Sequence, residues 1–290
     1  MIDRISASPR ALPRLRAAHA ARTAVLVAAW FIVSHAAPNA QAQALQTVAV
    51  KIPGTTVKID LVRIPGGTIT LPDPKAPGGK RQVKIAPLLV ARTELPWEAY
   101  DAWTTSKETP PTASDADAIA KPSHSYIPPD RGFGHIGYPT ISVSHLGAAN
   151  FCKWLSQVTG KKFRLPTTAE FSYAALAGAK PPAKPMPASE LTKYAWVAEN
   201  SGGKTHPVAK KLPNKWGLYD MLGNAGEWCT ELDGTPVLCG GSFQDKAAKV
   251  SWASRAPYHP DWQMEDPQFP KSKWWYSDGP MCGLRVVCEP

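Results

Sequence analysis

Thirty prolines in a chain of 290 residues constrain its fold more than any other feature of the sequence. Proline fixes the backbone angle φ and lacks the amide hydrogen that helix interiors and central strands need. The prolines recur along most of the chain, so long helices and long central strands are excluded there. Eleven tryptophans accompany them. We therefore expect short helices and strands joined by ordered loops that aromatic side chains pin to a core.

The first 44 residues are typical of an export signal and its cleavage region. A basic stretch ends at Arg22, an apolar run of 15 residues covers 23–37, and Pro38 with small residues at 40–44 follows. This order is that of a cleaved secretory signal. The apolar run is shorter than the roughly 20 residues that span a bilayer, so cleavage is favoured over an uncleaved anchor. We expect an exported protein, periplasmic or secreted, with one domain at 45–290 and no membrane span.

Part of the net charge of +10 lies in that first segment, where five arginines accompany one aspartate. The lysines and arginines of the remainder are scattered, without a block of like charges and without a nucleic-acid-binding motif. This pattern indicates a solvated basic surface, and a site for an acidic glycan or an anionic surface is the alternative. We expect no nucleic-acid partner.

The second half of the chain contains five cysteines, and export would allow disulfides to form. An odd number leaves at least one of them unpaired. Cys229 and Cys239 flank a turn-rich segment and could close a small loop, whereas Cys152 and Cys288 could tie a helix to the last strand. The sequence leaves the pairing of these four and Cys282 open. None of the spacings is the Cys-x-x-Cys of zinc sites.

Local patterns predict a small number of short elements. Alternating apolar residues predict strands near 45–51, 57–62, 68–71 and 82–91. Aromatic residues at helical spacing predict a short helix near 95–103, whose aromatic stripe belongs to the core. Ser144 and Gly160 bound a second helix, and Thr167 with Glu170 has the spacing of a capping box that begins a third. Residues 178–192 are predicted to be a loop.

Residues 214–228 form the most informative motif, Asn-Lys-Trp-Gly-Leu-Tyr-Asp-Met-Leu-Gly-Asn-Ala-Gly-Glu-Trp. Asp220 and Glu227 lie seven residues apart around a Gly-Asn turn, which is expected to point backbone carbonyls inward. Carboxylate and carbonyl oxygens are the ligands that calcium prefers. The chemistry alone allows a calcium site, but it favours the alternative of an Asx-type turn with Glu227 in a surface ion pair.

This segment resembles the Gly-Leu-Tyr-Asp-Met-x-Gly-Asn-x-x-Glu-Trp signature of the sulfatase-modifying-factor family, to which formylglycine-generating enzymes belong. Further landmarks of that family occur in order at residues 62–67, 91–100, 138–155, 163–171, 240–243 and 283–286. The resemblance covers residues 48–290. It implies an α+β fold with little regular secondary structure and two main helices, a variant of the C-type-lectin-like fold. It also implies structural calcium, carried onto the Asp220 and Glu227 side chains and the Gly223 and Ala225 carbonyls.

The residues that support the family's oxidase chemistry are replaced in this chain. Those enzymes convert a substrate cysteine to formylglycine with copper held by two thiolates, and soft thiolate ligands select Cu(I). The resemblance places the thiolates at Asp245 and Val250. The family's active-site tryptophan corresponds to Gly226 and its asparagine to Met281, while its serine is retained as residue 242. Copper-dependent formylglycine formation is therefore not expected.

A different ligand site could use the same region. Acidic residues and a histidine lie among aromatic residues at 245–278, and an aromatic-lined pocket with a few acids suits a sugar, an aromatic or a cationic ligand. The candidate site residues are Ser242, Asp245, His259 and Asp261. A packed aromatic layer with solvated acids is one alternative, and a thiol pair rebuilt from cysteines 239 and 282 is another.

Two functions follow from these observations. One is a calcium-stabilised, non-catalytic or accessory module that binds a small molecule, glycan or peptide. The sequence favours this module, and the alternative is an exported enzyme, such as an oxidase or a maturation enzyme, that uses a re-equipped pocket. Asp245, His259 and Asp261 within hydrogen-bonding reach of one another would favour the enzyme. Dispersed side chains that face solvent would favour the module.

Overall fold

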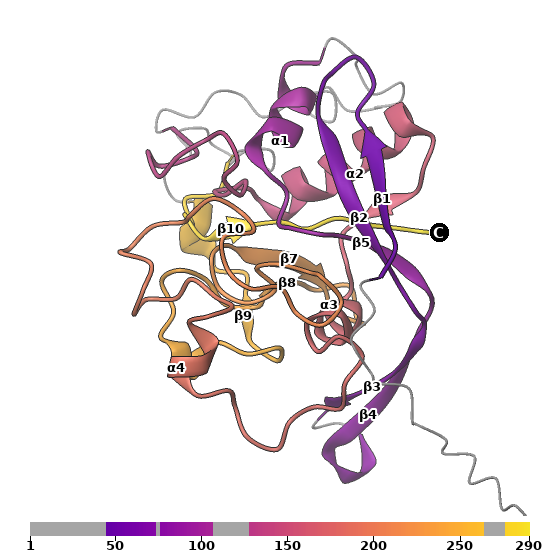
Figure 1. Ribbon diagram of the computed structural model, residues 1–290, viewed down its shortest axis with the longest axis vertical. Helices are drawn as coiled ribbons and strands as arrows, with labels where there is room; N and C mark the ends of the chain where they lie inside the picture. The colour runs from indigo at the N-terminus through magenta and orange to yellow at the C-terminus, as the bar shows by residue number, and fades with distance from the viewer. Residues whose placement is uncertain (1–44, 74–75, 107–127, 264–275) are drawn as a thin grey trace, which may run out of the picture. The chain divides into compact units, whose positions relative to one another are not determined.

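The computed structural model describes residues 45–73, 76–106, 128–263 and 276–290, and its elements are short throughout (Figure 1). Four α-helices are present in these ranges: α1 (Trp97–Thr104), α2 (His145–Thr159), α3 (Thr168–Ala175) and α4 (Ala188–Leu191). Three sheets accompany them. The α+β class predicted from the sequence is therefore confirmed. The proposed export signal at 1–44 lies outside the described residues and stays a prediction.

A five-stranded antiparallel sheet forms the middle of the described domain. Its order is β1 (Thr47–Lys51), β2 (Lys58–Ile64), β5 (Leu88–Ala91), β11 (Val287–Cys288) and β6 (Phe163–Arg164). The last strand of the chain thus lies between β5 and β6. Side chains alternate between the two faces of a strand. Leu61 and Leu89 pack with α1 and α2, whereas Val62 and Val90 pack with α3 and the second sheet.

The second sheet carries the candidate site. Its order is β10 (Cys282–Gly283), β7 (Gly226–Thr230), β8 (Pro236–Cys239) and β9 (Arg255–Pro257), and only the β10–β7 pair is parallel among these. A separate hairpin of β3 (Gly67–Pro72) and β4 (Lys80–Ile85) packs against α3. Short 3-10 turns occur at Pro77–Gly79, Ala247–Lys249 and Pro260–Gln263.

The helix ends are set by the residues that the sequence indicated. The Ser144 side chain accepts a hydrogen bond from the Gly147 amide at 3.0 Å, and Gly160 ends α2 in the left-handed conformation with φ of 66°. Thr167 and Glu170 form a reciprocal capping box at the start of α3. The predicted aromatic stripe of α1 is buried in the core. These local predictions are confirmed.

Two local predictions are wrong. The single strand predicted at 82–91 is two strands, β4 and β5, that belong to different sheets. Pro87 lies between them, and proline cannot supply the amide hydrogen that a continuous strand needs there. The loop predicted at 178–192 contains the short helix α4, which buries Leu191. Within the described ranges, every helix is too short or too polar to cross a membrane.

Candidate functional site

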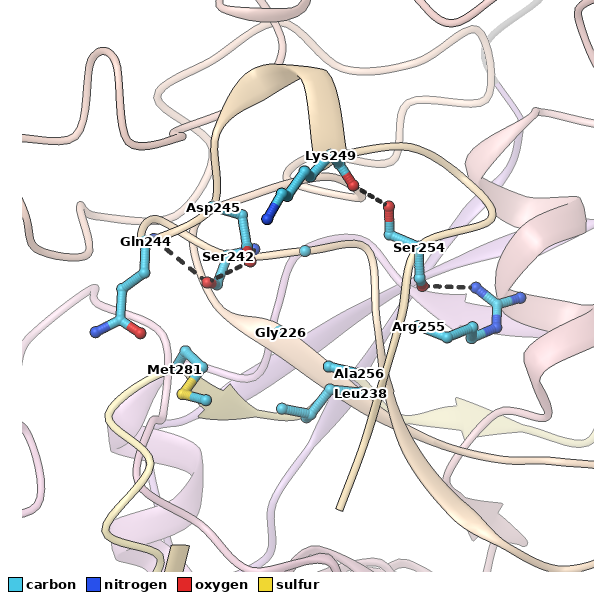
Figure 2. Close-up of a pocket in the computed structure, with 11 residues that line it drawn as sticks. Gly226, Leu238, Ser242, Gln244, Asp245, Lys249, Ser254, Arg255, Ala256 and Met281 are labelled. Carbon is cyan, nitrogen blue, oxygen red and sulfur yellow. Dashed lines mark hydrogen bonds between the residues drawn. The ribbon is translucent and has the colours of Figure 1, made fainter. Parts of the chain in front are cut away.

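A cavity of about 300 Å³ opens over the second sheet, beside the Ser242 turn (Figure 2). The first residue of β7 and the middle of β8 form its floor, together with Met281 just before β10. Polar residues from 242–255 form the remaining wall. This is the region that the sequence resemblance assigned to the family's active site. Among the described residues, no aromatic side chain lines the cavity, so these residues do not form the aromatic-lined pocket expected from the sequence.

Two glycines directly before Ser242 form the turn that places this serine on the cavity wall. Gly240 and Gly241 both have positive φ, 85° and 72°, in the region that favours glycine. A Cβ atom on Gly241 would lie 2.7 Å from a methyl carbon of Val250. Val250 is buried beneath the turn and does not line the cavity. The position of the family's second thiolate is therefore occupied here by a core packing residue.

Ser242 and Asp245, two of the predicted site residues, are brought together. The Ser242 hydroxyl and backbone amide both donate to Oδ2 of Asp245, at 2.8 and 2.9 Å. Figure 2 shows this pair on the wall of the cavity, with Gln244 beside it. The Gln244 amide donates to the serine hydroxyl at 3.3 Å. The serine is thus held as a donor to the carboxylate, in a turn that is also hydrogen-bonded through its backbone to Ala198 and Asn224.

His259 and Asp261, the other two candidates, lie apart from this pair. Nδ1 of His259 is 3.3 Å from Oδ2 of Asp261, and the two side chains are 60% and 66% exposed. Neither residue lines the cavity. The turn that begins at Pro260 places both side chains in solvent. The cluster of Asp245, His259 and Asp261 that would have favoured an enzyme is therefore not assembled.

Two basic residues of the cavity were missed by the sequence reasoning. Arg255 directs its guanidinium to α3, where it donates to the Ser172 hydroxyl at 2.6 Å and to the Thr168 carbonyl at 3.2 Å. Lys249 lines the cavity, and its side-chain ammonium has no hydrogen-bond or ion-pair partner within the described ranges. One signal could have identified it. Lys249 directly precedes Val250, the position assigned to a thiolate of the family.

The cysteines do not rebuild a metal-binding thiol pair in the cavity. All five are buried free thiols, so neither proposed disulfide is formed. Cys239 follows the cavity residue Leu238 along β8, so its side chain points to the opposite face of the sheet. Its thiol lies against that of Cys229. Burial and this contact raise the pKa of Cys229 well above its usual range. Burial raises the pKa of Cys282 to about 12. Neither Cys239 nor Cys282 lines the cavity.

Glu227 takes part in a buried ion pair, which corrects the alternative of a surface pair. The guanidinium of Arg285 donates to both carboxylate oxygens of Glu227, with a shortest contact of 2.6 Å. Both side chains are 1% exposed. Arg285 also donates to the carbonyls of Ala91 and Tyr219, each at 2.8 Å. The arginine therefore joins the middle sheet, the motif loop and β7.

Two further carboxylates lie near this pair. Oδ2 of Asp220 accepts from the Ala209 amide at 2.7 Å, while Oδ1 is buried without a partner in the described residues. Glu94, which the sequence reasoning did not single out, accepts from the Asn224 side chain and the Ala225 amide, both at 2.7 Å. Burial, together with the charges of Asp220 and Glu227, raises the pKa of Glu94 well above its usual range. Burial also raises the pKa of Asp220.

This arrangement does not fit the predicted calcium cage. Calcium takes six to eight oxygen ligands, but both side-chain oxygens of Glu227 are hydrogen-bonded to Arg285, a cation already in place. Among the described residues, no group of three or more carboxylate, histidine or cysteine side chains is placed to hold a metal. Calcium binding by Asp220, Gly223, Ala225 and Glu227 stays a prediction, and it would require Glu227 to exchange Arg285 for the metal.

Comparison with known proteins matches residues 49–269 to the sulfatase-modifying factor enzyme 1-like domain. The serine/threonine-protein kinase pkn1 of Chlamydia caviae is 31% identical over 124 residues, which are 43% of this chain and 18% of that protein. The formylglycine-generating enzyme of Mycobacterium tuberculosis is 31% identical over 106 residues, which are 32% of this chain and 33% of the enzyme. The chain thus spans a third or less of the length of these two relatives.

One solved structure shows how far the similarity of fold extends. The Treponema denticola variable protein 1 superposes with a TM-score of 0.60 at 22% sequence identity. The match covers 84% of this chain and 99% of that chain. At this level of identity, the comparison supports a common fold and carries no argument about activity.

Proposed function

The chain belongs to the sulfatase-modifying factor enzyme 1-like family, and we propose that it is an exported, ligand-binding member without the family's copper oxidase chemistry. One observation carries the proposal. The two positions that the resemblance assigns to copper-binding thiolates hold Asp245, hydrogen-bonded to Ser242, and Val250, buried in the core. A carboxylate and a methyl-bearing side chain cannot act as a soft ligand pair for Cu(I).

The form of the cavity supports binding. Its floor consists of Gly226, Leu238 and Met281, and its wall carries hydrogen-bonding groups from the Ser242 turn and from Lys249. Ligand pockets typically combine an apolar lining with a few placed polar groups, and about 300 Å³ is at the lower end of their range. The ligand class is therefore a small molecule or one residue of a peptide rather than an extended chain.

The catalytic alternative has less support from the described residues. It required Asp245, His259 and Asp261 within hydrogen-bonding reach of one another, but the last two form a separate, exposed pair. Within the described ranges, no histidine or lysine is hydrogen-bonded to the Ser242 hydroxyl, which donates to Asp245. A serine nucleophile is normally activated by such a base.

Ligand-detected NMR tests the proposal with three defined sets of probes: free amino acids, short peptides and monosaccharides. Ala256 lines the cavity and is exposed, so Ala256→Trp fills the cavity without disturbing the core. Ala248→Trp is the matched control, because Ala248 is exposed nearby but does not line the cavity. We expect a signal from at least one set with the wild type and Ala248→Trp, and its loss with Ala256→Trp.

A second assay addresses the oxidase chemistry. The protein is incubated with a sulfatase-type cysteine peptide and supplied copper, and the peptide is examined by mass spectrometry. We expect the cysteine to remain unmodified. Formation of formylglycine would contradict the proposal, as would a failure of all three probe sets to bind the wild type.

A further inference from the structure

The charged side chains of the cavity differ in how many of their hydrogen-bonding groups have a partner. Among the described residues, three charged side chains line it: Asp245, Lys249 and Arg255. Arg255 is fully engaged outside the cavity, because its guanidinium donates to Ser172 and to backbone carbonyls and lies 3.7 Å from Glu231. The arginine therefore contributes only its stem to the wall. The two remaining charges, one of each sign, decide what the cavity can bind.

Lys249 and Asp245 each have unused hydrogen-bonding capacity. The ammonium of Lys249 has no partner within the described ranges and can donate three hydrogen bonds. Figure 2 shows its side chain extended along the wall toward the side on which Asp245 lies. Only Oδ2 of Asp245 accepts hydrogen bonds from Ser242, so Oδ1 remains available. The two residues are not within ion-pair distance of each other, although they line one small cavity.

The floor opposite these charges is apolar. Leu238, Ala256 and Met281 line it, and Gly226 adds no side chain. A Cβ atom on Gly226 would lie 3.4 Å from the Met281 carbonyl and 3.5 Å from Leu238, so the floor is closed beneath this glycine. An apolar group of a ligand can bury against these side chains, and burial of such a group is favourable by about 25 cal/mol per Å².

We propose that the cavity binds a small zwitterion of the amino-acid type, an inference that rests on the proposed binding function. The ligand's carboxylate contacts Lys249, its ammonium contacts Oδ1 of Asp245, and its apolar side chain lies on Leu238, Ala256 and Met281. A purely anionic ligand would desolvate Asp245 without supplying a positive charge to it, and a purely cationic ligand would desolvate Lys249 without supplying a negative charge. Each unpaired charge carries a desolvation cost, so a ligand with both charges is favoured.

A monosaccharide fits these observations less well. It would bring hydroxyl groups but no charge to pair with either residue. It would also lack an aromatic platform, since no aromatic ring lines the cavity in the described part of the chain. The zwitterion therefore accounts for both unsatisfied charges and for the apolar floor.

Isothermal titration calorimetry with leucine, methionine and phenylalanine as probes tests this inference. The tightest-binding probe is then compared with its amide, which lacks the carboxylate, and with its N-acetyl derivative, which lacks the ammonium. Hydrogen bonds to charged groups contribute about 1.5–3 kcal/mol, so we expect Kd to rise about tenfold or more for each derivative. Equal affinity for the free acid and either derivative would overturn the proposal.

Single substitutions assign each charge to its residue. Lys249→Gln is expected to weaken binding of the free amino acid about tenfold or more while leaving binding of its amide unchanged. Asp245→Asn is expected to weaken the free acid similarly and to leave its N-acetyl derivative unchanged. Lys246→Gln is the matched control, because Lys246 is exposed in the same turn but does not line the cavity. Thermal unfolding of each variant shows whether it is folded.

The outcomes separate this inference from the proposed function. If no amino acid binds but another probe binds in a manner blocked by Ala256→Trp, the zwitterion is wrong and the binding function stands. If no probe binds at all, both are wrong. If Lys249→Gln binds the free amino acid as tightly as the wild type and the Lys246→Gln control do, the assignment of the carboxylate to Lys249 is overturned.

Discussion

The two faces of the second sheet differ in how completely their polar groups are satisfied. Along β7, Gly226 lines the cavity, and the next residue, Glu227, turns to the opposite face and pairs with Arg285. Along β8, Leu238 likewise lines the cavity, and Cys239 lies on the opposite face against Cys229. One face therefore carries a buried ion pair with nearly every donor engaged, and the other carries exposed charges with spare capacity. The first arrangement stabilises a fold, whereas the second is available to a ligand.

The largest effect should follow from removing the cation of the buried face. Arg285→Met leaves Glu227 buried without its ion-pair partner, and breaking a buried pair costs about 3–5 kcal/mol. Urea unfolding measures the loss. Lys193→Met is the control, because its pair with Glu190 is exposed and no measurable change is expected.

A double variant distinguishes the effect of an uncompensated charge from a general failure to fold. Replacing both partners, as Glu227→Leu with Arg285→Met, removes the unpaired charge that the single variant leaves behind. We expect it to recover part of the lost stability. If the double variant is less stable than Arg285→Met alone, the account based on an uncompensated charge is wrong.

A smaller effect should follow from a change in the turn of the motif that joins the two faces. Gly223 has φ of 71°, and a Cβ atom there would lie 2.2 Å from the backbone oxygen of Trp196. Gly54 has φ of 74° with nothing within 4 Å of such an atom. Gly54→Ala therefore measures the backbone cost alone, about 1–2 kcal/mol. Gly223→Ala should cost about 1–3 kcal/mol more because of the clash, as thermal unfolding would show. Equal losses would contradict the close approach.

The smallest effect concerns an exposed charge cluster, the counterpart of the buried one. His135 is 37% exposed, and its ring nitrogens lie 2.7 Å from an oxygen of Asp101 and 3.0 Å from one of Asp130. Burial lowers the pKa of His135, but hydrogen bonds to the two carboxylates, with their charges, outweigh burial and raise it. A histidine with a raised pKa stabilises the fold below its unfolded-state pKa of about 6.5, and this contribution is lost as the pH rises through the folded-state value.

Thermal unfolding of the wild type and His135→Asn between pH 6 and 9 tests this effect. The wild type should be the more stable protein at pH 6, and the difference in Tm should shrink toward pH 9. Solvent screening keeps the difference small compared with that of Arg285→Met. A difference that stays constant with pH would show that the ring acts through its stack on Trp97, at a centroid distance of 5.0 Å, rather than through its charge.

Helix boundaries and the family could be predicted from the sequence because they depend on residues close together in the chain. Residues three positions apart form both the Ser144 cap and the capping box at Thr167. The end of α2 depends on the backbone conformation of one residue, the left-handed Gly160. The pairing of Ser242 with Asp245 is equally local, because the partners are three positions apart. Such features are set by short-range geometry, which a sequence pattern records directly.

The sequence could not predict which groups pair with the charged residues, because these partners are brought together by the tertiary structure. Arg285 reaches Glu227 across 58 residues and the Ala91 carbonyl across 194. No local pattern distinguishes that arrangement from a calcium ligand set. His259 and Asp261 looked equivalent to Asp245 by composition, but their turn exposes them, and Arg255 lines the cavity while its charge is satisfied on α3.

By itself, the sequence determined that this chain has an α+β fold of short elements and belongs to the sulfatase-modifying factor enzyme 1-like family, and it has no cysteine at positions 245 and 250. Only the tertiary structure decided which charges are satisfied and which remain available. The physical reason is that a charge's role depends on its burial and its partners. Burial and partners depend on how segments distant in the sequence pack together. That packing buries Arg285 beside its partners, and it leaves Lys249 on the wall of a cavity.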